Sequence, residues 1–453
     1  MRRLYRYLPP FAGDYSGVGS ALYELGGMLC IHDASGCTGN YVGFDEPRSY
    51  DSRQLVYCTG LRKNDAILGN EEVYIDKIVR AAQEMKPRFI ALVGSPVPLI
   101  IGFDFKGVAM ELENRLGIPA FGFDTGGMKG SYKDGVVLAL KKLMDYYVLP
   151  HRAELKKIPG NKKRVNIVGA TPLDISSENL RACRGMLAAC GYEVVSILAM
   201  ENDMEQLLKF YQADVNLAVT QAGAVLAKEM EKDYGMPYLA GVPIGKAGTE
   251  HYFKYLEQVL DTGESAEVSQ VLQRSQMNES ENTEDVSDMK DAENKNIFEK
   301  AENESVSGTK NTAAAGDENN IYEVSNDSKT QMKEFRGEKG RAVILEDGII
   351  ASSIRVELLA QGYEQVDVIS LFGKDSGMDG IEAEYAEDED MILEAVNRED
   401  CTLLVGDPIL LQHRKEKEGV RFIEIPKYAV SSKLMHHRRW IYMGEGWSRK
   451  YSG

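Results

Sequence analysis

Residues 26–37 read GGMLCIHDASGC, an apolar run that leads into a glycine and a cysteine. This pattern predicts a strand followed by a tight turn. Residues 73–86, VYIDKIVRAAQEMK, have the apolar spacing of a helix, and residues 89–95, FIALVGS, form a continuous apolar run. Such a run is typical of a strand buried on both faces of a parallel sheet. The order strand, helix, strand therefore predicts an open α/β sheet.

The same alternation recurs twice further along the chain. Residues 164–174, RVNIVGATPLD, predict a strand and a turn, and residues 176–195, SSENLRACRGMLAACGYEVV, predict a helix and a further strand. Residues 341–347, RAVILED, open a third segment of the same kind. Each segment has the size of a Rossmann-type layer. We predict an α/β fold with three Rossmann-like domains on parallel sheets, at residues 1–160, 161–262 and 341–453, the last with a C-terminal tail.

Residues 263–340 have a different composition, dominated by Glu, Asn, Ser, Asp, Lys and Thr. Between Asp261 and Gly340 there are 19 acidic and 9 basic residues, with almost no apolar periodicity. Such a segment cannot bury enough apolar area to offset its chain entropy. We predict a disordered acidic insert that the fold tolerates as a surface loop. The alternative is an insert that contains a short partner-binding helix.

Charge and hydropathy exclude several classes of protein. The formal net charge of −17 argues against a general nucleic-acid binder, which would carry a basic face. The apolar runs have the length of strands, and none approaches the roughly 18 residues of a membrane helix. The first ten residues, MRRLYRYLPP, lack the apolar run of a signal peptide. We expect a soluble cytoplasmic protein with no membrane contact. Since no Walker phosphate-binding motif occurs, the chain is not expected to hydrolyse ATP itself.

The six cysteines are unevenly distributed, because three of them fall within 29 residues: Cys30, Cys37 and Cys58. A large chain without a secretion signal has little use for disulfides, so this clustering indicates metal ligation or redox chemistry. Cys37 follows a glycine at the expected carboxyl end of a strand, where open α/β sheets bind ligands. The others are expected to serve packing, since Cys183 and Cys190 share a helix and Cys401 begins a strand.

Three motifs in order resemble the first domain of nitrogenase component 1 chains and their relatives, the protochlorophyllide and chlorophyllide reductases. That family has His-Gly-x-x-Gly-Cys after its first strand, a second cysteine in a loop, a stretch ending in Gly-Gly, and a Cys-Pro-x-x-x-Ile-Gly-Asp-Asp stretch. Here Cys37 matches the first cysteine and Cys58 the second. Ser95-Pro96 matches the Cys-Pro, so the third family cysteine is a serine. Further matches are residues 64–70, 102–104, 116–119, 121–127, 231–237 and 241–245.

The resemblance implies an iron–sulfur cluster, of the 4Fe–4S type, in the first domain. Cys37 and Cys58 are the expected ligands, with Cys30 and Ser95 as further candidates in place of the missing cysteine. Asp33 is a third candidate to replace the missing cysteine. The alternative for Cys30 is a structural role, as a buried residue of the strand. No molybdenum cofactor is expected, because the second-domain cysteine of nitrogenase would fall near residues 219–221, where there is none.

The resemblance also implies a function and partners. We expect a component 1-like subunit of a nitrogenase-type reductase, and hence an oxidoreductase. It would relay electrons from an ATP-dependent iron–sulfur reductase to an unidentified substrate in a cleft among the domains. A second component 1-like chain, identical or paralogous, would share the cluster interface. The alternatives are a scaffold or carrier for metal-cluster assembly without turnover, and a Rossmann-type binding protein without metal.

Overall fold

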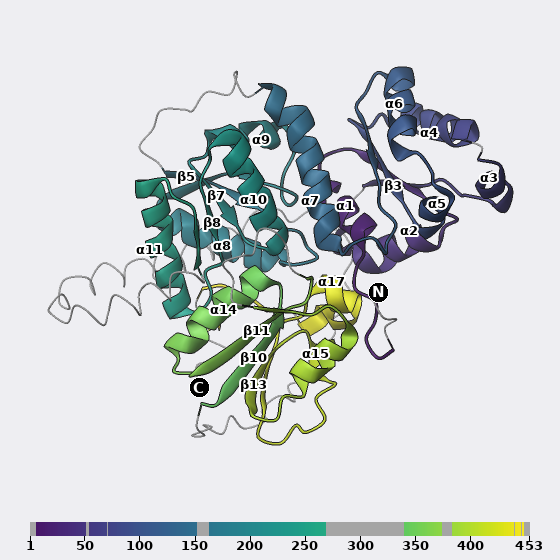
Figure 1. Cartoon of the computed structure of the whole chain (residues 1–453). Coiled ribbons are helices and arrows are strands. Elements are labelled where there is room, and N and C mark those ends of the chain that lie inside the picture. The colour runs from purple at the N-terminus through teal and green to yellow at the C-terminus, as the bar shows by residue number, and fades with distance from the viewer. Residues whose placement is uncertain are drawn as a thin grey trace, which may run out of the picture.

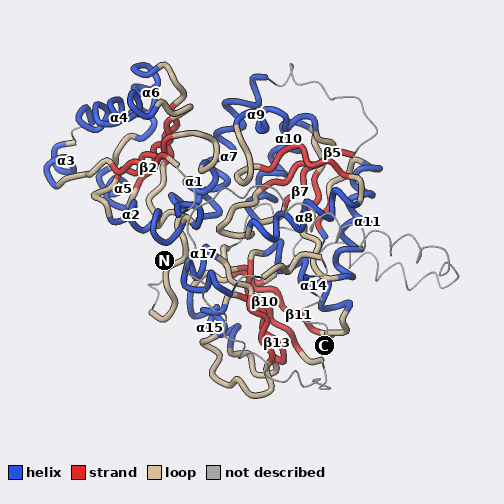
Figure 2. The backbone as a smooth tube through the Cα atoms, turned by 180° about the vertical axis from the view of Figure 1, so that it is seen from behind, coloured by secondary structure: helices blue, strands red, loops and turns tan. Residues whose placement is uncertain are grey.

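Three separate parallel sheets form the core of the protein, as Figure 1 shows. The computed structural model describes residues 6–50, 54–69, 71–151, 163–268, 339–373, 383–438, 440–444 and 446–447. Seen from behind in Figure 2, the strands of the three sheets remain distinct, and helices surround each sheet. The predicted fold, α/β with three parallel sheets, is confirmed.

The first sheet has the strand order β2-β1-β3-β4, and all its strands run parallel. Its strands are β1 (Met28–His32), β2 (Leu55–Cys58), β3 (Ile90–Gly94) and β4 (Ala120–Phe123). Its helices are α1 (Asp14–Leu22), α2 (Gly36–Asn40), α3 (Lys63–Leu68), α4 (Glu71–Met85), α5 (Pro96–Ile101), α6 (Phe105–Leu116) and α7 (Tyr132–Leu143). Helices α1 and α7 pack on one face and α4 and α6 on the other, so the inner strands β1 and β3 are buried on both sides. This explains the continuous apolar runs.

The second sheet has the order β6-β5-β7-β8-β9. Its strands are β5 (Lys163–Val168), β6 (Tyr192–Ile197), β7 (Val215–Ala218), β8 (Tyr238–Ala240) and β9 (Ala266–Glu267). Its helices are α8 (Ser177–Ala189), α9 (Met204–Leu208), α10 (Gln221–Tyr234) and α11 (Lys246–Thr262). Because β9 pairs with β8, this sheet extends five residues beyond the predicted domain end at 262.

The third sheet has the order β12-β11-β10-β13-β14. Its strands are β10 (Arg341–Glu346), β11 (Gln365–Ser370), β12 (Glu384–Tyr385), β13 (Cys401–Gly406) and β14 (Arg421–Glu424). Its helices are α14 (Gly348–Ala360), α15 (Glu389–Val396), α16 (Pro408–Leu411) and α17 (Tyr428–Ser431). Shorter helical turns are η1 (Tyr41–Asp45), η2 (Pro47–Tyr50), η3 (Met144–Val148), η4 (Leu149–His151), η5 (Lys209–Gln212) and η6 (Ser432–Arg438).

The domain boundaries stay predictions, but two segments lie apart from the sheet nearest to them in sequence. The C-terminal segment, described at 440–444 and 446–447, pairs with Ile244 after β8, and its Trp447 is fully buried in an apolar cluster to which both the second and the third sheet contribute. Near the N-terminus, backbone amides of residues 6–8 donate to the carboxylate of Glu389 on α15. The predicted disordered insert falls largely on residues 269–338, outside the described residues. Among the described helices, none has the length and apolar character needed to cross a membrane.

Candidate functional site

The predicted ligands gather around the carboxyl edge of the first sheet. In a parallel sheet the carboxyl ends of all strands lie along one edge, and loops from neighbouring strands meet there. Strand β1 ends at His32, β2 ends at Cys58, and Ser95 follows β3 directly. Ile31 lies opposite Cys58 in the ladder, and His32 opposite Gly94, so the three chain segments end at the same level.

Cys37 lies in the first turn of α2, directly after β1. The loop before it is held by the carboxylate of Asp33, which accepts the backbone N–H of Ser35 at 2.9 Å and of Thr38 at 3.0 Å. Ser35 has a φ of 141°, which is costly for a residue with a side chain. The Cys37 thiol is half-buried; burial and the nearby charge of Asp33 raise its pKa. The thiol is thus accessible and fixed in position.

Cys58 lies at the end of β2, and its side chain is also half-buried. Its sulfur lies 3.6 Å from the carbonyl oxygen of Asp33. The same residue accepts the amide of Leu61 at 2.8 Å, so Asp33 ties the loop after β2 to the loop after β1. Residues paired in a parallel ladder point to the same face, and Ile31 faces the core that Cys37 also contacts. The structure therefore brings Cys37 and Cys58 to one face of one edge.

The side chains of the two other candidates are buried. Cys30 points to the opposite face of β1, into the apolar layer under α4 and α6, and burial raises its thiol pKa. Ser95 is buried, and its hydroxyl donates to the carbonyl oxygen of His32 at 2.8 Å. Among the described residues, no group of three or more His, Cys, Asp or Glu side chains is placed to hold a metal ion. The ligand roles of all four residues remain predictions.

A small pocket opens beside this edge, on the α4 side of β1. His32 forms its base, with Nδ1 2.8 Å from the Thr59 hydroxyl and the ring against Tyr74 and Phe103, at centroid distances of 4.3 and 4.4 Å. Burial and the nearby Lys77 charge lower the pKa of His32 to about 4, so the imidazole is neutral near pH 7. The pocket volume of about 30 Å³ suits a water molecule rather than a substrate.

Large apolar side chains project into solvent from the elements around the edge. We call this group the apolar rim; it comprises Ile67 and Leu68 on α3, Val73 on α4, and Val97, Ile100 and Ile101 on α5. Several exposed apolar side chains on adjacent elements mark an interaction surface more often than a free surface. The rim is continuous with the pocket, because Val73 and Ile101 line both.

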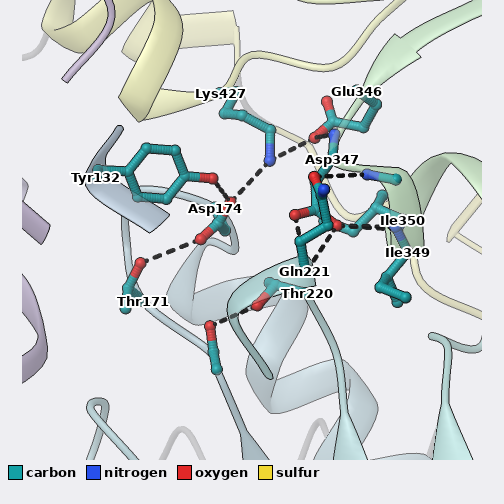
Figure 3. A network of polar contacts seen from close by, with 12 residues as sticks. Tyr132, Thr171, Asp174, Thr220, Gln221, Glu346, Asp347, Ile349, Ile350 and Lys427 are labelled. Atoms are coloured by element: carbon teal, nitrogen blue, oxygen red, sulfur yellow. Dashed lines mark hydrogen bonds and ion pairs between the residues drawn. The ribbon is translucent and has the colours of Figure 1, made fainter. Parts of the chain in front are cut away.

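A second polar cluster lies where the three domains meet (Figure 3). The ammonium of Lys427, which precedes α17, lies 3.0 Å from Asp174 Oδ1 and also binds Glu346 Oε1 at the end of β10. The hydroxyl of Tyr132 on α7 donates to the same Asp174 carboxylate. Each of these side chains is about 1% exposed. No motif in the sequence indicated this cluster. Its carboxylates nevertheless stand at the ends of two predicted strand segments, Asp174 in residues 164–174 and Glu346 in residues 341–347.

The cluster holds more negative than positive groups. Burial raises the pKa of Glu346 and that of its neighbour Asp347, the latter to about 7. The positive charge of Lys427 lowers both pKa values, but by less than burial raises them. Burial alone would lower the pKa of Lys427, but the charges of Glu346 and Asp174 raise it above its usual value. Lys427 is therefore charged, and it is the cation that the buried carboxylates share.

The arrangement of three parallel sheets is also found in solved nitrogenase structures. The structure titled "Nitrogenase Cp1 at pH 6.5" matches with a TM-score of 0.56 at 14% identity, covering 94% of this chain and 87% of that chain. The structure titled "Nitrogenase Cp1 at pH 5" matches with a TM-score of 0.53 at 16% identity, covering 97% and 79%. At these identities the likeness establishes the fold alone.

The sequence places the chain more closely. It belongs to the nitrogenase component 1 type oxidoreductase family, whose model matches residues 14–316. The nitrogenase iron-molybdenum cofactor biosynthesis protein NifE of Clostridium pasteurianum is 26% identical over 243 residues, 52% of this chain and 51% of that protein. The nitrogenase molybdenum-iron protein alpha chain of Methanosarcina barkeri is 23% identical over 269 residues, 56% and 48%.

A light-independent protochlorophyllide reductase subunit from Nostoc punctiforme is 24% identical over 233 residues, 50% of this chain and 46% of that protein. The matches thus span about half the length of these curated relatives. The resemblance expected from the cysteine motifs is confirmed at the level of the family.

Proposed function

We propose that the chain is a cytoplasmic component 1-like subunit of a nitrogenase-type reductase. It would hold an iron–sulfur cluster at the carboxyl edge of the first sheet. The observation that carries this proposal is the placement of Cys37 and Cys58, two half-buried thiols on one face of that edge, both tied to Asp33. A bound cluster would supply one-electron transfer at this edge.

The donor set fits such a cluster in part. A Cβ built at Gly36, Gly39 or Gly43 would meet no other atom within 4 Å, so the Cys37 loop is open to an approaching group. A 4Fe–4S cluster takes four ligands, usually thiolates. One chain offers two accessible thiols here, and two chains would offer four. A second component 1-like chain, identical or paralogous, therefore completes the site most simply.

The apolar rim supports contact with partners at this edge. It lies beside the loops of Cys37 and Cys58, so a chain that covers it would also shield the cluster from water. We assign this region to the second component 1-like chain and to a separate ATP-dependent iron–sulfur reductase. A separate reductase is needed because this sequence carries no Walker motif of its own.

A molybdenum cofactor does not fit this chain. The position where nitrogenase would place its second-domain cysteine falls at Val219, Thr220 and Gln221, all buried. The Gln221 amide group donates to the Gly373 carbonyl and accepts from the Ser370 hydroxyl, each at 3.0 Å. The protein itself thus fills this position, and we propose no step through such a cofactor.

The test begins with protein purified without oxygen and measured for iron, acid-labile sulfide and visible absorption. We expect Cys37→Ala and Cys58→Ala each to abolish the chromophore, while Cys183→Ala, at a buried position on α8, keeps it. Cys30→Ala and Ser95→Ala are expected to keep it too, because Cys30 is buried on the opposite face of β1 and the buried Ser95 hydroxyl already donates to the His32 carbonyl. A colourless protein that cannot be reconstituted with iron and sulfide would overturn the proposal.

A scaffold for metal-cluster assembly is the second candidate. It is favoured by the similarity to NifE, a protein named for cofactor biosynthesis. The two functions differ in the fate of the cluster. A reductase subunit is reoxidised by its substrate after reduction by the ATP-dependent partner, whereas a scaffold transfers its cluster intact to an acceptor protein. Iron retained on this chain over repeated reduction cycles favours the reductase, and iron lost to an acceptor favours the scaffold.

A further inference from the structure

The carboxyl edges of the second and third sheets face each other across the cluster of Lys427. In both sheets the strand order reverses at the strand that ends there: β5 lies between β6 and β7, and β10 lies between β11 and β13. Open α/β sheets bind ligands at such switch points, in the crevice outside the carboxyl ends. In this protein the two switch points lie on either side of the buried Lys427 cluster.

Carboxylates of the chain itself occupy the helix N-termini of this crevice. Asp347 accepts the amides of Ile349 and Ile350 in its own helix α14, at 3.0 and 3.4 Å. It also accepts the amide of Gln221, the first residue of α10, at 2.9 Å. A helix N-terminus attracts anions, and here a side chain from the third domain supplies the anion for a helix of the second.

Asp407, at the end of β13, acts in the same way. It accepts the amide of Ile409 in α16 at 2.9 Å, the amide of Lys427 at 2.8 Å and the hydroxyl of Ser431 at 2.7 Å. Three carboxylates thus act on the ammonium of Lys427, those of Asp174, Glu346 and Asp347, while Asp407 holds the backbone amide of the same lysine. The crevice is acidic, and its occupant is a lysine of the same chain.

Two buried polar atoms next to Lys427 have no hydrogen-bond partner among the described residues: Glu346 Oε2 and the hydroxyl of Tyr442. The charges of Glu346, Lys427 and Asp174 all act on Tyr442, which places this tyrosine at the cluster. A buried polar group without a partner costs roughly 1–3 kcal/mol relative to its hydrated state. The closed crevice therefore contains groups that would gain hydrogen bonds on hydration.

The C-terminal segment covers the crevice and spans both domains. Trp440 donates from its indole nitrogen to the carbonyl of Glu424 on β14, at 2.7 Å. Its own carbonyl accepts from Asn179 on α8 at 3.0 Å, and Asn179 accepts the amide of Tyr442 at 2.9 Å. The segment then pairs with Ile244 of the second domain. It can leave only if the contacts to both domains break.

We propose that Lys427, Asp174 and Glu346 form a latch that holds the second and third domains closed over a ligand crevice. The C-terminal segment is the strap that covers it. Opening the latch separates the ion pairs, hydrates the carboxylates and exposes the carboxyl edges of both sheets. A ligand that enters between these domains must replace Lys427 as the partner of the carboxylates, so it carries a cationic group. This latch does not depend on a cluster in the first domain.

Protonation of the carboxylates adds a pH dependence to the latch. The titratable groups that act on the Lys427 ammonium are Asp174 from the loop after β5, Glu346 at the end of β10, Asp347 at the N-terminus of α14 and Tyr442 from the strap. Tyr132 of α7 binds Asp174, and Asp407, which follows β13, lies within the field of Glu346. Burial raises the pKa of Asp347 to about 7 and that of Asp407 to about 6. The closed state therefore binds more protons than the hydrated open state, and closure weakens as pH rises from about 4 through about 7.

The experiment uses the two tryptophans of the chain, Trp440 and Trp447, as native probes, because both lie in the strap. Lys427→Met removes the cation and keeps the length of the side chain. At pH 7.5 we expect red-shifted tryptophan emission and at least ten-fold faster hydrogen exchange at the ends of β5 and β10. Lys417→Met, at an exposed lysine, serves as the matched control and leaves both readouts unchanged.

A second variant keeps the test decisive if Lys427→Met does not fold. The triple variant Lys427→Met, Asp174→Asn, Glu346→Gln removes the charges together and retains the shapes. We expect native emission and slow exchange at pH 7.5. The latch is rejected if Lys427→Met folds and exchanges as slowly as the control. It is also rejected if the triple variant opens as readily as the single one.

Discussion

Lys427 Nζ lies 3.0 Å from Asp174 Oδ1, although the two residues are 253 positions apart in the chain. Both side chains are about 1% exposed, so the pair is removed from water. Removing one partner of a buried ion pair leaves an uncompensated charge and typically costs 3–5 kcal/mol. Breaking this pair should therefore destabilise the contact between the second and third domains.

Tyr132 offers a milder test of the same junction. Its hydroxyl donates to the Asp174 carboxylate, and Tyr132→Phe removes that hydrogen bond while the ring stays packed against Phe372. Hydrogen bonds to charged groups contribute about 1.5–3 kcal/mol, and we expect the free energy of unfolding to fall by that amount. Chemical denaturation measures it. Tyr7→Phe, at an exposed position, should change stability by less than about 0.5 kcal/mol; equal effects would contradict the assignment.

Global stability should also depend on pH through Asp347. Burial raises its pKa to about 7 in the folded protein, above the usual value near 4. The protonated form is thus favoured in the folded state, and its contribution is present below pH 4 and lost as pH rises through about 7. This loss amounts to at most about 1.4 kcal/mol per pH unit for one group.

The control for this prediction is Asp347→Asn, which keeps one acceptor oxygen for the helix amides and cannot titrate. Unfolding free energies of both proteins are compared at pH 5, 6 and 7. The unaltered protein should lose more stability than the variant across this range. Parallel curves would show that Asp347 titrates as it does in the unfolded chain.

The cysteines should differ in reactivity in the metal-free protein. Burial raises the thiol pKa of Cys30, Cys37 and Cys183, but Cys37 and Cys58 are half-buried at the sheet edge, whereas Cys30 and Cys183 are completely buried in apolar layers. Only a thiolate reacts readily with iodoacetamide. We expect native-state labelling, read by peptide mass spectrometry, at Cys37 and Cys58 well before Cys30. Labelling of Cys30 at the same rate would mean that the α4 and α6 layer does not cover β1.

Cys30 also illustrates what the sequence can and cannot predict. The strands are predictable because sheets covered by helices on both faces need continuous apolar runs, as in residues 89–95. Alternation along a strand puts Cys30 and Ile31 on opposite faces, but the sequence does not say which face meets the loop of Cys37. That depends on packing between α1, α7 and the sheet, which involves residues far apart in the chain.

The junction is harder to predict for a related reason. Asp174, Glu346 and Lys427 each follow or end a strand, but no fixed spacing connects them, so no motif indicates their contact. Chain order alone assigns the C-terminal segment to the third domain, which it follows in sequence. The segment instead contacts both domains, since Met443 pairs with Ile244 and Trp447 is buried in an apolar cluster shared by the second and third sheets.

The loop before Cys37 provides a prediction in which stability should increase. Ser35 has a φ of 141°, its side chain is exposed, and its hydrogen bonds are made by the backbone, whose N–H donates to Asp33 and whose carbonyl accepts the amide of Gly39. A backbone strained in this way costs on the order of 1–3 kcal/mol for a residue with a Cβ, and glycine avoids that cost. Glycine also makes the unfolded chain more flexible, which offsets about 0.4–1 kcal/mol of the gain. We expect Ser35→Gly to raise the free energy of unfolding by roughly 1 kcal/mol and to leave cluster loading intact.

Ser35→Ala, which keeps the Cβ and removes only the hydroxyl, should have no such effect in the same denaturation experiment. If both variants behave alike, the loop relaxes without strain, and Asp33 alone sets the position of Cys37.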